Sequence, residues 1–306
     1  MAAKFDFIND ITISKMQWKL KVRVVRMWEK PDRFNPGSIF SIELVLQDEK
    51  GDRIHASIGK SVLHIFNRKI NEHGLYVMAN FIVCQNKERF NTTKHTLMLT
   101  FTQRTTVAET IDPLFPMNIF DLRPYHQLIN KVDVNESELF DVIGEIVNFS
   151  EVQKQKQGEI SRKYMDIELE DDERNKLSAT FWGEFVDQVI PHLLSSNNQR
   201  IIVIMQLIKA HKFQDSYSVR NTWNTSKLWI NPTFPQSEEF KSRLHIFNHV
   251  STLISIFLRI VLTVILIYKY RLNVVRDTCS ERLTLPHFHT IPTSTLFSSH
   301  DIIKSD

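Results

Sequence analysis

Ile42-Glu43-Leu44, followed by Asp48-Glu49-Lys50-Gly51-Asp52 and Ile54-His55-Ala56-Ser57, is the stretch that decides the fold, because it returns in altered form. The second copy runs Ile167-Glu168-Leu169, Asp171-Asp172-Glu173-Arg174-Asn175 and Leu177-Ser178-Ala179-Thr180. Each copy alternates apolar and polar residues on both sides of a charged turn, which is the pattern of a β-hairpin with one buried face. We therefore expect a duplicated unit.

The segments around the two hairpins repeat as well. A run of alternating type precedes each hairpin, at 18–26 and 140–147, and the apolar spacing becomes helical after it, at 62–70 and 185–193. Strand-rich runs close the units, at 75–83 and 96–101 in the first and at 200–210 and 218–230 in the second. Three strands, a helix and two more strands is the order of the OB-fold, a barrel that binds oligonucleotides or oligosaccharides. We predict an all-β protein with short helices, built from two tandem OB-fold barrels and an apolar C-terminal tail.

The length of 306 residues accommodates two such domains with a remainder. We expect a first OB domain at 1–105, a linker at 106–130, a second OB domain at 131–244, an apolar segment at 245–276 and a disordered tail at 277–306. Cys84 and Cys279 are the only cysteines, which excludes a disulfide framework and a cysteine zinc site. The N-terminus has no apolar core after its first lysine, so we expect no secretion and a reducing compartment.

Charge is distributed unequally between the two domains. Residues 1–105 hold 17 Lys and Arg against 10 Asp and Glu, whereas residues 106–244 hold 15 against 21. A basic barrel suits a polyanion, because cations in contact with phosphates release counterions. Much of the negative charge of the second domain falls at the turn of its hairpin, and its last strands still carry several cations.

Dispersed motifs in a constant order resemble the large subunits of plant-type replication protein A. In the first domain they are Trp18 to Trp28, the run 42–56, Asn80-Phe81, Phe90 and Thr96 to Phe101; in the second they are Asp141-Val142-Ile143-Gly144-Glu145, Ile167-Glu168-Leu169, Thr180-Phe181-Trp182-Gly183-Glu184 and Ile230-Asn231-Pro232. The resemblance covers roughly residues 5 to 244 and corresponds to the family's first two DNA-binding OB domains. It implies single-stranded DNA binding in DNA replication, repair or recombination, and a nuclear location.

The resemblance also implies where a DNA strand is bound. The family stacks bases on aromatic rings in basic grooves, which gains ~1–3 kcal/mol per base without reading sequence. It places stacking rings at Trp182 and Phe213 in the second domain and at Phe90 in the first, where the other aromatic position is Gly59. The candidate phosphate contacts are Arg53, Lys87, Arg89, Lys94, Lys209, Lys212 and Arg220. For each aromatic residue the ordinary alternative is core packing, and for each cation it is a solvated surface charge.

Motifs for catalysis or metal binding fail on spacing. Gly59-Lys60-Ser61 ends like a phosphate loop, but Ile54 stands where that motif needs glycine. Residues 133–137 open like a calcium loop, but Glu138 replaces the required glycine. His287-Phe288-His289 has no third ligand at a suitable spacing. We predict no catalysis and no cofactor.

The tail departs from the family. Family members continue into a third, zinc-containing OB domain that joins the other subunits, whereas residues 251–270 of this chain are nearly all apolar. The tail is a non-homologous replacement, a buried or oligomerising helix, or a membrane span, which Arg259 disfavours at a cost of roughly 2.5–3.5 kcal/mol. The expected partner is single-stranded DNA; other replication protein A subunits, and a membrane through 250–270, are less favoured.

Two functions from other classes remain open. The barrels are an adaptor for protein partners if they have lost nucleic-acid binding, a reading that Gly59 and the acidic second domain encourage. An oligosaccharide- or tRNA-binding OB protein is the third reading, because a fold does not fix a function.

Overall fold

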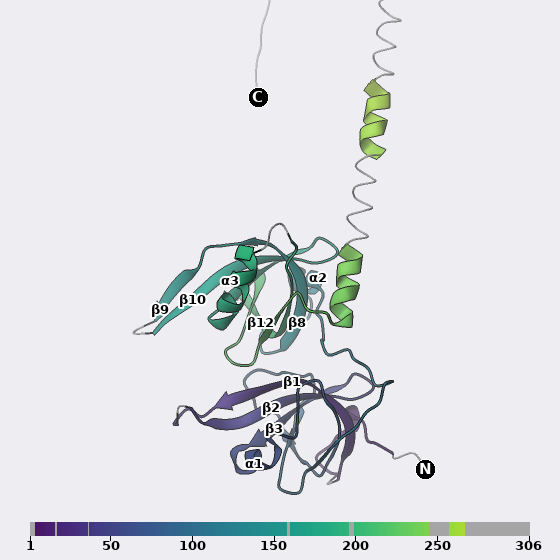
Figure 1. Cartoon of the computed structure of the whole chain (residues 1–306), viewed down its shortest axis with the longest axis vertical. Helices are drawn as coiled ribbons and strands as arrows, with labels where there is room; N and C mark the ends of the chain where they lie inside the picture. Colours follow the sequence, from purple (N-terminus) through teal and green to yellow (C-terminus); the bar gives the residue numbers. More distant parts are fainter. Residues whose placement is uncertain are drawn as a thin grey trace, which may run out of the picture. The chain divides into compact units, whose positions relative to one another are not determined.

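The computed structural model describes residues 4–15, 17–35, 37–157, 160–195, 199–244 and 257–266. The chain divides into a compact unit, Met1–Phe247, and a second unit, Asn248–Asp306. The compact unit contains two β-barrels of the same design, so the prediction of two tandem barrels in an all-β fold is confirmed (Figure 1).

The first barrel follows the predicted order of strands and helix. Its elements are η1 (Ile8–Asp10), β1 (Lys19–Pro31), β2 (Ile39–Gln47), β3 (Arg53–Gly59), η2 (Lys60–Val62), α1 (Leu63–Phe66), β4 (Leu75–Ala79), β5 (Ile82–Gln85), β6 (Leu97–Thr100) and β7 (Thr106–Glu109). The strands are hydrogen-bonded in the order β5-β6-β3-β2-β1-β4-β7, with β3 and β6 parallel. β7 pairs with β4 and lies in the segment that was expected to be linker.

The second barrel repeats this plan. Its elements are α2 (Tyr125–Ile129), β8 (Leu139–Phe149), β9 (Gln153–Gln157), β10 (Ile160–Glu170), β11 (Lys176–Trp182), α3 (Glu184–Ser195), β12 (Ile202–Phe213), β13 (Ser216–Arg220) and β14 (Lys227–Ile230). The parallel pair β11–β13 corresponds to β3–β6, and β14 pairs with β12 as β7 pairs with β4. Residues 235–244 form a further helix.

The repeated hairpins match at the level of single hydrogen bonds. The Asp48 carboxylate accepts the backbone N–H groups of Lys50 and Asp52, at 3.0 and 3.1 Å. The Asp171 carboxylate likewise accepts those of Glu173 and Asn175, at 3.0 and 2.8 Å. An aspartate that bonds to its own following backbone stabilises a tight turn. The turn therefore fixes the register of both hairpins.

Each barrel has its own hydrophobic core. The first is built from the inward residues of β1 to β6 together with Ile8 and Ile11, and the second from those of β8 to β13 together with α2 and α3. Tyr125 from α2 lies over Gly144 of β8, where a Cβ atom would come within 2.2 Å of the tyrosine hydroxyl. Gly144 is therefore required by the close approach of α2. The predicted helix at 62–70 is shorter than expected, because only η2 and α1 are helical there.

β9 and the first half of β10 form an arm that the sequence analysis did not predict. The strands pair from Gln153↔Tyr164 to Gln157↔Ile160, and the arm projects from the second barrel in Figure 1. The sequence of β9 alternates glutamine and lysine and has no apolar residue, which is why this strand carried no strand signal.

A third hydrophobic cluster joins the two barrels. Val25 and Val45 of the first barrel pack with Ile119 and Phe120 of the connecting segment. The second barrel and the helix at 235–244 supply the other members, which are Leu139, Ile143, Ile202, Ile204, Leu207, Phe240 and Leu244. Phe120 makes edge contacts with Trp229 and Phe234, at ring-centroid distances of 6.2 and 5.3 Å. The outer surfaces of the two barrels therefore bury apolar area against each other.

Polar contacts also cross between the barrels. Glu72 of the first barrel pairs with Arg26 at 2.9 Å and with Lys227 of β14. Burial alone would raise the pKa of Glu72, but the two cations outweigh it and lower that pKa. The Arg26 guanidinium also donates to the Thr225 carbonyl at 3.0 Å, and the Gln206 amide donates to the Val25 carbonyl at 3.3 Å. The junction thus combines an apolar centre with specific polar pairs.

The tail is described only in part. Residues 257–266 are helical, with mostly exposed apolar side chains. No helix in the described ranges is long and apolar enough to cross a membrane. The remainder of the predicted apolar segment at 245–276 and the predicted disordered tail at 277–306 lie outside the described residues.

Candidate nucleic-acid interface

The outer face of β2 and β3 in the first barrel is covered. OB folds bind oligonucleotides on this face and on the adjoining loops. Here the outward side chains of Ser41, Glu43, Gln47 and His55 are only 2–4% exposed. The middle of the face is therefore closed to a bound strand in this conformation.

A buried polar network holds that face closed. His55 Nε2 lies 2.8 Å from Glu43 Oε2, and His55 Nδ1 lies 2.7 Å from Thr92 Oγ1 in the loop between β5 and β6. Ser41 and Ser57 donate to the other oxygen of the Glu43 carboxylate. Burial would raise the pKa of Glu43, but its hydrogen bonds to His55 and Ser41 prevail and lower that pKa.

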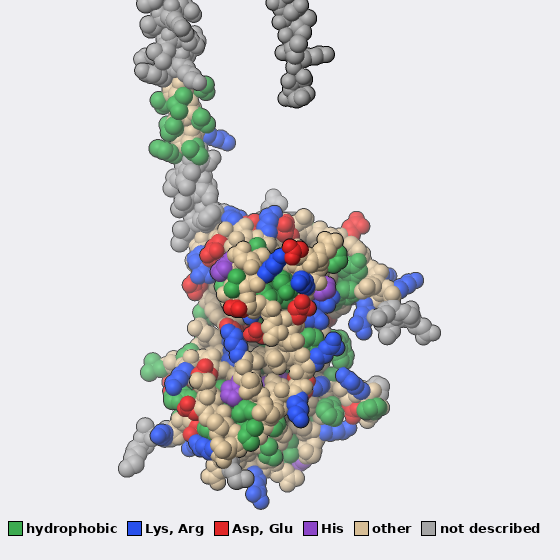
Figure 2. Space-filling view, turned by 180° about the vertical axis from the view of Figure 1, so that it is seen from behind, with side chains coloured by type: hydrophobic (Ala, Val, Ile, Leu, Met, Phe, Trp, Pro, Cys, Tyr) green, Lys and Arg blue, Asp and Glu red, His purple; other side chains and the backbone are tan. Residues whose placement is uncertain are grey.

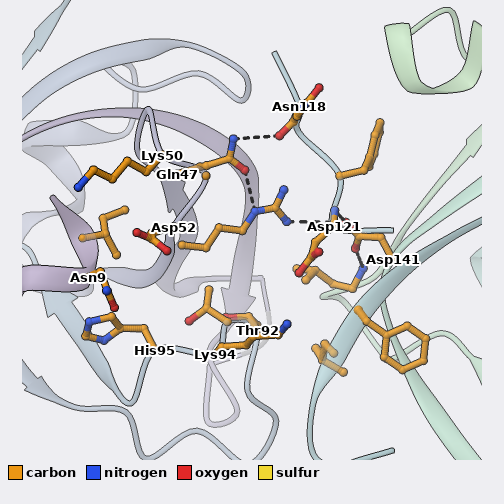
Figure 3. A pocket seen from close by; sticks show the side chains of 18 of the residues that line it. Asn9, Gln47, Lys50, Asp52, Thr92, Lys94, His95, Asn118, Asp121 and Asp141 are labelled. Carbon is orange, nitrogen blue, oxygen red and sulfur yellow. Dashed lines mark hydrogen bonds and ion pairs between the residues drawn. The ribbon is translucent and has the colours of Figure 1, made fainter. Parts of the chain in front are cut away.

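Arg53, a predicted phosphate contact, is engaged within the protein. It lines a polar cavity of about 540 Å³ between the first barrel, the connecting segment and β8 (Figure 3). Its Nε donates to Gln47 Oε1 at 2.8 Å, and its Nη1 lies 3.8 Å from Asp141 Oδ2. The guanidinium of Arg53 is therefore occupied by partners within the protein in this conformation. Lys94 lines the same cavity and is exposed.

Asp141 is the buried acid of this junction. Its carboxylate accepts the backbone N–H groups of Leu207 and Asp121, both at 2.8 Å. Leu207 has a positive φ of 52° at a break in the β8–β12 register, so its N–H needs a partner outside the ladder. Burial raises the pKa of Asp141 to about 6, against the opposing effects of Arg53 and the two N–H donors.

This raised pKa predicts a pH-dependent stability. Because the pKa of Asp141 rises from 3.8 to about 6 on folding, the native state binds more protons between these values. The free energy of unfolding should therefore decrease as the pH rises from about 4 to 6, by roughly 3 kcal/mol from this group. We expect Asp141→Asn to lose this slope in urea-unfolding midpoints measured at several pH values. Asp215→Asn, at an exposed site, should keep it, and an unchanged slope in Asp141→Asn would contradict the assignment.

The corresponding outer face of the second barrel is accessible. Trp182, at the end of β11, is half-buried, and Tyr164 of β10 stacks on it with ring centroids 4.8 Å apart and planes 26° apart. The two residues are directly paired across the hairpin. The Tyr164 hydroxyl donates to Gln153 of the arm, and the Asn221 side chain bonds to both backbone groups of Trp182. Trp182 is thus held in place while part of its ring system remains accessible.

Phe213 marks the other end of this face. It is 64% exposed at the end of β12, opposite Ser216 in the β12–β13 hairpin, and Lys212 beside it is exposed. From Ser216 to Asn221, which contacts Trp182, β13 and its extension span roughly 16 Å. This distance is the length of a few nucleotides.

Cations lie between the two rings and form no ion pair within the described residues. Lys209 and Arg220 are paired across β12 and β13, and neither forms an ion pair with any residue that the structure describes. Burial, then Arg220 and Arg89, lower the pKa of Lys209. Burial, then Arg220 and Lys209, also lower the pKa of His211. Glu136 opposes this effect at His211 and Arg220, so the cluster keeps an excess of positive charge that an anion would balance.

The first barrel contributes its β5–β6 loop to the same region. Phe90 packs against the third hydrophobic cluster and is only partly accessible. Lys209 Nζ lies 4.8 Å from the centroid of its ring, and Arg89 Cζ lies 5.3 Å from it. Arg89 and Lys87 are exposed. The structure thus brings Phe90 and Arg89 to Lys209, whereas Lys94 lies at the cavity beside Arg53.

Gly59, at the first barrel's second aromatic position, has an ordinary φ, and a Cβ atom there would meet nothing within 4 Å. The position is open, but it carries no ring.

Charges of both signs remain on the surface. Figure 2 shows basic and acidic side chains interspersed on one side of the compact unit. On the outer face of the second barrel, Asp166 accepts from Thr180 at 2.9 Å and Glu168 pairs with Lys176 at 3.2 Å. The basic cluster is therefore local, and the acidic end of the same face is partly neutralised. No group of three or more metal-ligating side chains is found in the part of the chain that the structure describes.

Sequence reasoning missed several accessible aromatic residues, Phe40 and Phe149 among them. Tyr164 had a signal, because the hairpin register pairs it with Trp182. Trp223, in the loop after β13, and Phe34, in the loop between β1 and β2, are strongly exposed but belong to no repeating pattern.

Comparison with known proteins identifies a domain family and relatives that this chain resembles. Residues 9–131 match a domain family described as a domain of unknown function, DUF223. The chain is 21% identical over 243 residues to one replication protein A 70 kDa DNA-binding subunit of Arabidopsis thaliana, covering 77% of the chain and 30% of that protein. It is 24% identical over 239 residues to another such protein of the same organism, covering 74% of the chain and 36% of that protein. The resemblance to replication protein A large subunits is confirmed.

A solved replication protein A heterotrimer bound to ssDNA shares the fold. The TM-score is 0.53 at 18% identity, and the match covers 78% of this chain and 54% of that one. The chain spans about a third of the length of the curated replication protein A relatives that it matches.

Proposed function

We propose that this chain binds single-stranded DNA through the outer face of its second barrel, as a non-catalytic protein of DNA replication, repair or recombination in the nucleus. The observation that carries the proposal is the pair Lys209 and Arg220, which forms no ion pair in the described residues and lies between the partly accessible ring of Trp182 and the exposed ring of Phe213. Stacking contributes ~1–3 kcal/mol per base, and the cations hold the phosphates between the bases.

The relatives support the same substrate class. Two are named DNA-binding subunits, and the heterotrimer with the shared fold was solved with ssDNA. Other replication protein A subunits are the protein partners that this relationship supports.

An adaptor function is the second candidate. The covered outer face of the first barrel favours it, because that face has no room for a strand in this conformation. A protein that binds no nucleic acid through either barrel would fit this reading.

The test is a titration of fluorescent oligo-dT with the full chain at two salt concentrations. We expect binding to oligonucleotides of about 8–10 residues or longer, weaker binding to a duplex of equal length, and a log–log salt slope of about −0.7 per phosphate contacted. A duplex is expected to bind less well because its base faces are hidden from the rings. Equal affinity for duplex, or no salt dependence, would contradict the proposal and favour the adaptor.

A further inference from the structure

Trp223 is a large apolar side chain exposed at the border between the barrels. It is 79% exposed in the loop between β13 and β14. No aromatic or cationic side chain within the described ranges contacts its ring. An exposed tryptophan gives up the burial of its ring without stabilising the fold. A single exposed ring is common on protein surfaces, so the loop that carries it and the charges beside that loop decide what it can bind.

The loop that carries Trp223 is fixed to the second barrel. The Asn221 side chain binds both backbone groups of Trp182, at 2.8 and 3.2 Å. Ser226 Oγ accepts the Thr222 N–H and donates to the Leu207 carbonyl, each at 2.7 Å. The loop therefore lies between one stacking ring and the strand that carries Lys209.

The same loop is fixed to the first barrel. The Asn224 amide donates to the Glu29 carbonyl at the end of β1, and Arg26 donates to the Thr225 carbonyl at 3.0 Å. Trp223 is thus held between backbone contacts to both barrels. The backbone of this loop is therefore fixed before a ligand binds, which lowers the conformational cost of binding there.

Cations near the start of this loop also come from both barrels: Arg220 precedes Trp223 by three residues and is paired with Lys209. Arg89 belongs to the β5–β6 loop of the first barrel, whereas Lys209 and Arg220 belong to the second. Burial and mutual repulsion lower the pKa of Lys209, and the Arg220 Nε is a buried donor without a hydrogen-bond partner among the described residues. Glu136 is the acidic group that acts on Arg220, so the three cations together leave an excess of positive charge at this site.

We propose that Trp223 stacks one base of a single-stranded nucleic acid where the strand passes between the barrels, with Arg89, Lys209 and Arg220 holding a phosphate of the same segment. A nucleotide unit supplies both a π-face and an anion, whereas an apolar protein surface would leave three cations unneutralised. The inference rests on the proposed function and adds a site built by both barrels.

The test compares Trp223→Ala with Trp223→Phe in the full chain. Oligo-dT of increasing length is titrated by fluorescence anisotropy, and urea midpoints confirm that each variant is folded. We expect Trp223→Ala to weaken binding by about 5- to 150-fold for oligonucleotides long enough to reach the border, and to leave the shortest bound oligonucleotides unaffected. Trp223→Phe should retain most of the affinity. Leu114→Ala, a control at a side chain 92% exposed, should bind like the unaltered chain.

Each other outcome is decisive. Unchanged affinity in Trp223→Ala would overturn the proposal. Equal losses in the alanine and phenylalanine variants would overturn stacking. An unaltered chain that binds no single strand would contradict the proposed function itself, which keeps the two failures distinct.

As a second measurement, Arg89→Glu should weaken binding to the same long oligonucleotides and flatten the salt dependence of that binding. An unchanged salt slope would exclude the shared phosphate site.

Discussion

Replacing Trp182 and Phe213 together with alanine is expected to weaken single-stranded DNA binding by roughly 2–5 kcal/mol, because each lost base stack costs ~1–3 kcal/mol. The loss should be similar at about 50 and 200 mM salt, because stacking releases no counterions. Fluorescence anisotropy with oligo-dT measures it directly. Trp182 is half-buried under Tyr164, so Trp182→Phe with Phe213→Tyr is the matched variant that should keep most of the affinity.

Charge reversal provides the contrast. Arg89→Glu with Lys94→Glu should weaken binding mainly at low salt, because salt screens the attraction between these exposed cations and the phosphates. If both sets of variants show the same salt profile, stacking and long-range attraction are not divided between these residues.

Replacing Phe120 with alanine is expected to destabilise both barrels together. The ring is 4% exposed and contacts Trp229 and Phe234 in the third hydrophobic cluster. Removing a buried phenylalanine ring costs about 3–5 kcal/mol through lost burial and the cavity left behind. We expect one cooperative urea transition in the unaltered chain and a lower midpoint in the variant, followed by circular dichroism and tryptophan fluorescence.

The control for this experiment is Phe34→Ala, because that ring is 97% exposed and its loss should leave the midpoint unchanged. A decrease of less than about 1 kcal/mol in Phe120→Ala would mean that the barrels do not depend on their junction.

The repeated hairpin made the fold predictable from sequence. Alternation with a period of two separates inward from outward residues, so Leu44 and Ile167 were assigned correctly to the two cores. The turn aspartates sit at equivalent places in both copies, and that fixes the register without any knowledge of tertiary structure. The resemblance placed a ring at Phe213, and that ring is exposed in the structure.

The alternation of apolar and polar residues does not show which residues cover an outward side chain. Glu43, His55 and Arg53 are polar and point outward from their strands, so they looked like surface residues. Their burial depends on Thr92 and on Asp141, which lie 37 to 88 positions further along the chain and meet them only in the folded unit. Trp223 was missed for a different reason, because it belongs to no repeating pattern and its loop meets the first barrel only in the folded unit.

The β9–β10 arm has a consequence for handling the protein. β9 is the last strand in its sheet order, so one side of it offers unpaired backbone groups that another chain could extend. Lys154 and Lys156 are exposed on this strand, and two arms approaching edge to edge would bring like charges together. Concentrated salt, which strips nucleic acid from a preparation, screens that repulsion as well. Conditions that remove a bound strand therefore also weaken the barrier to self-association through β9.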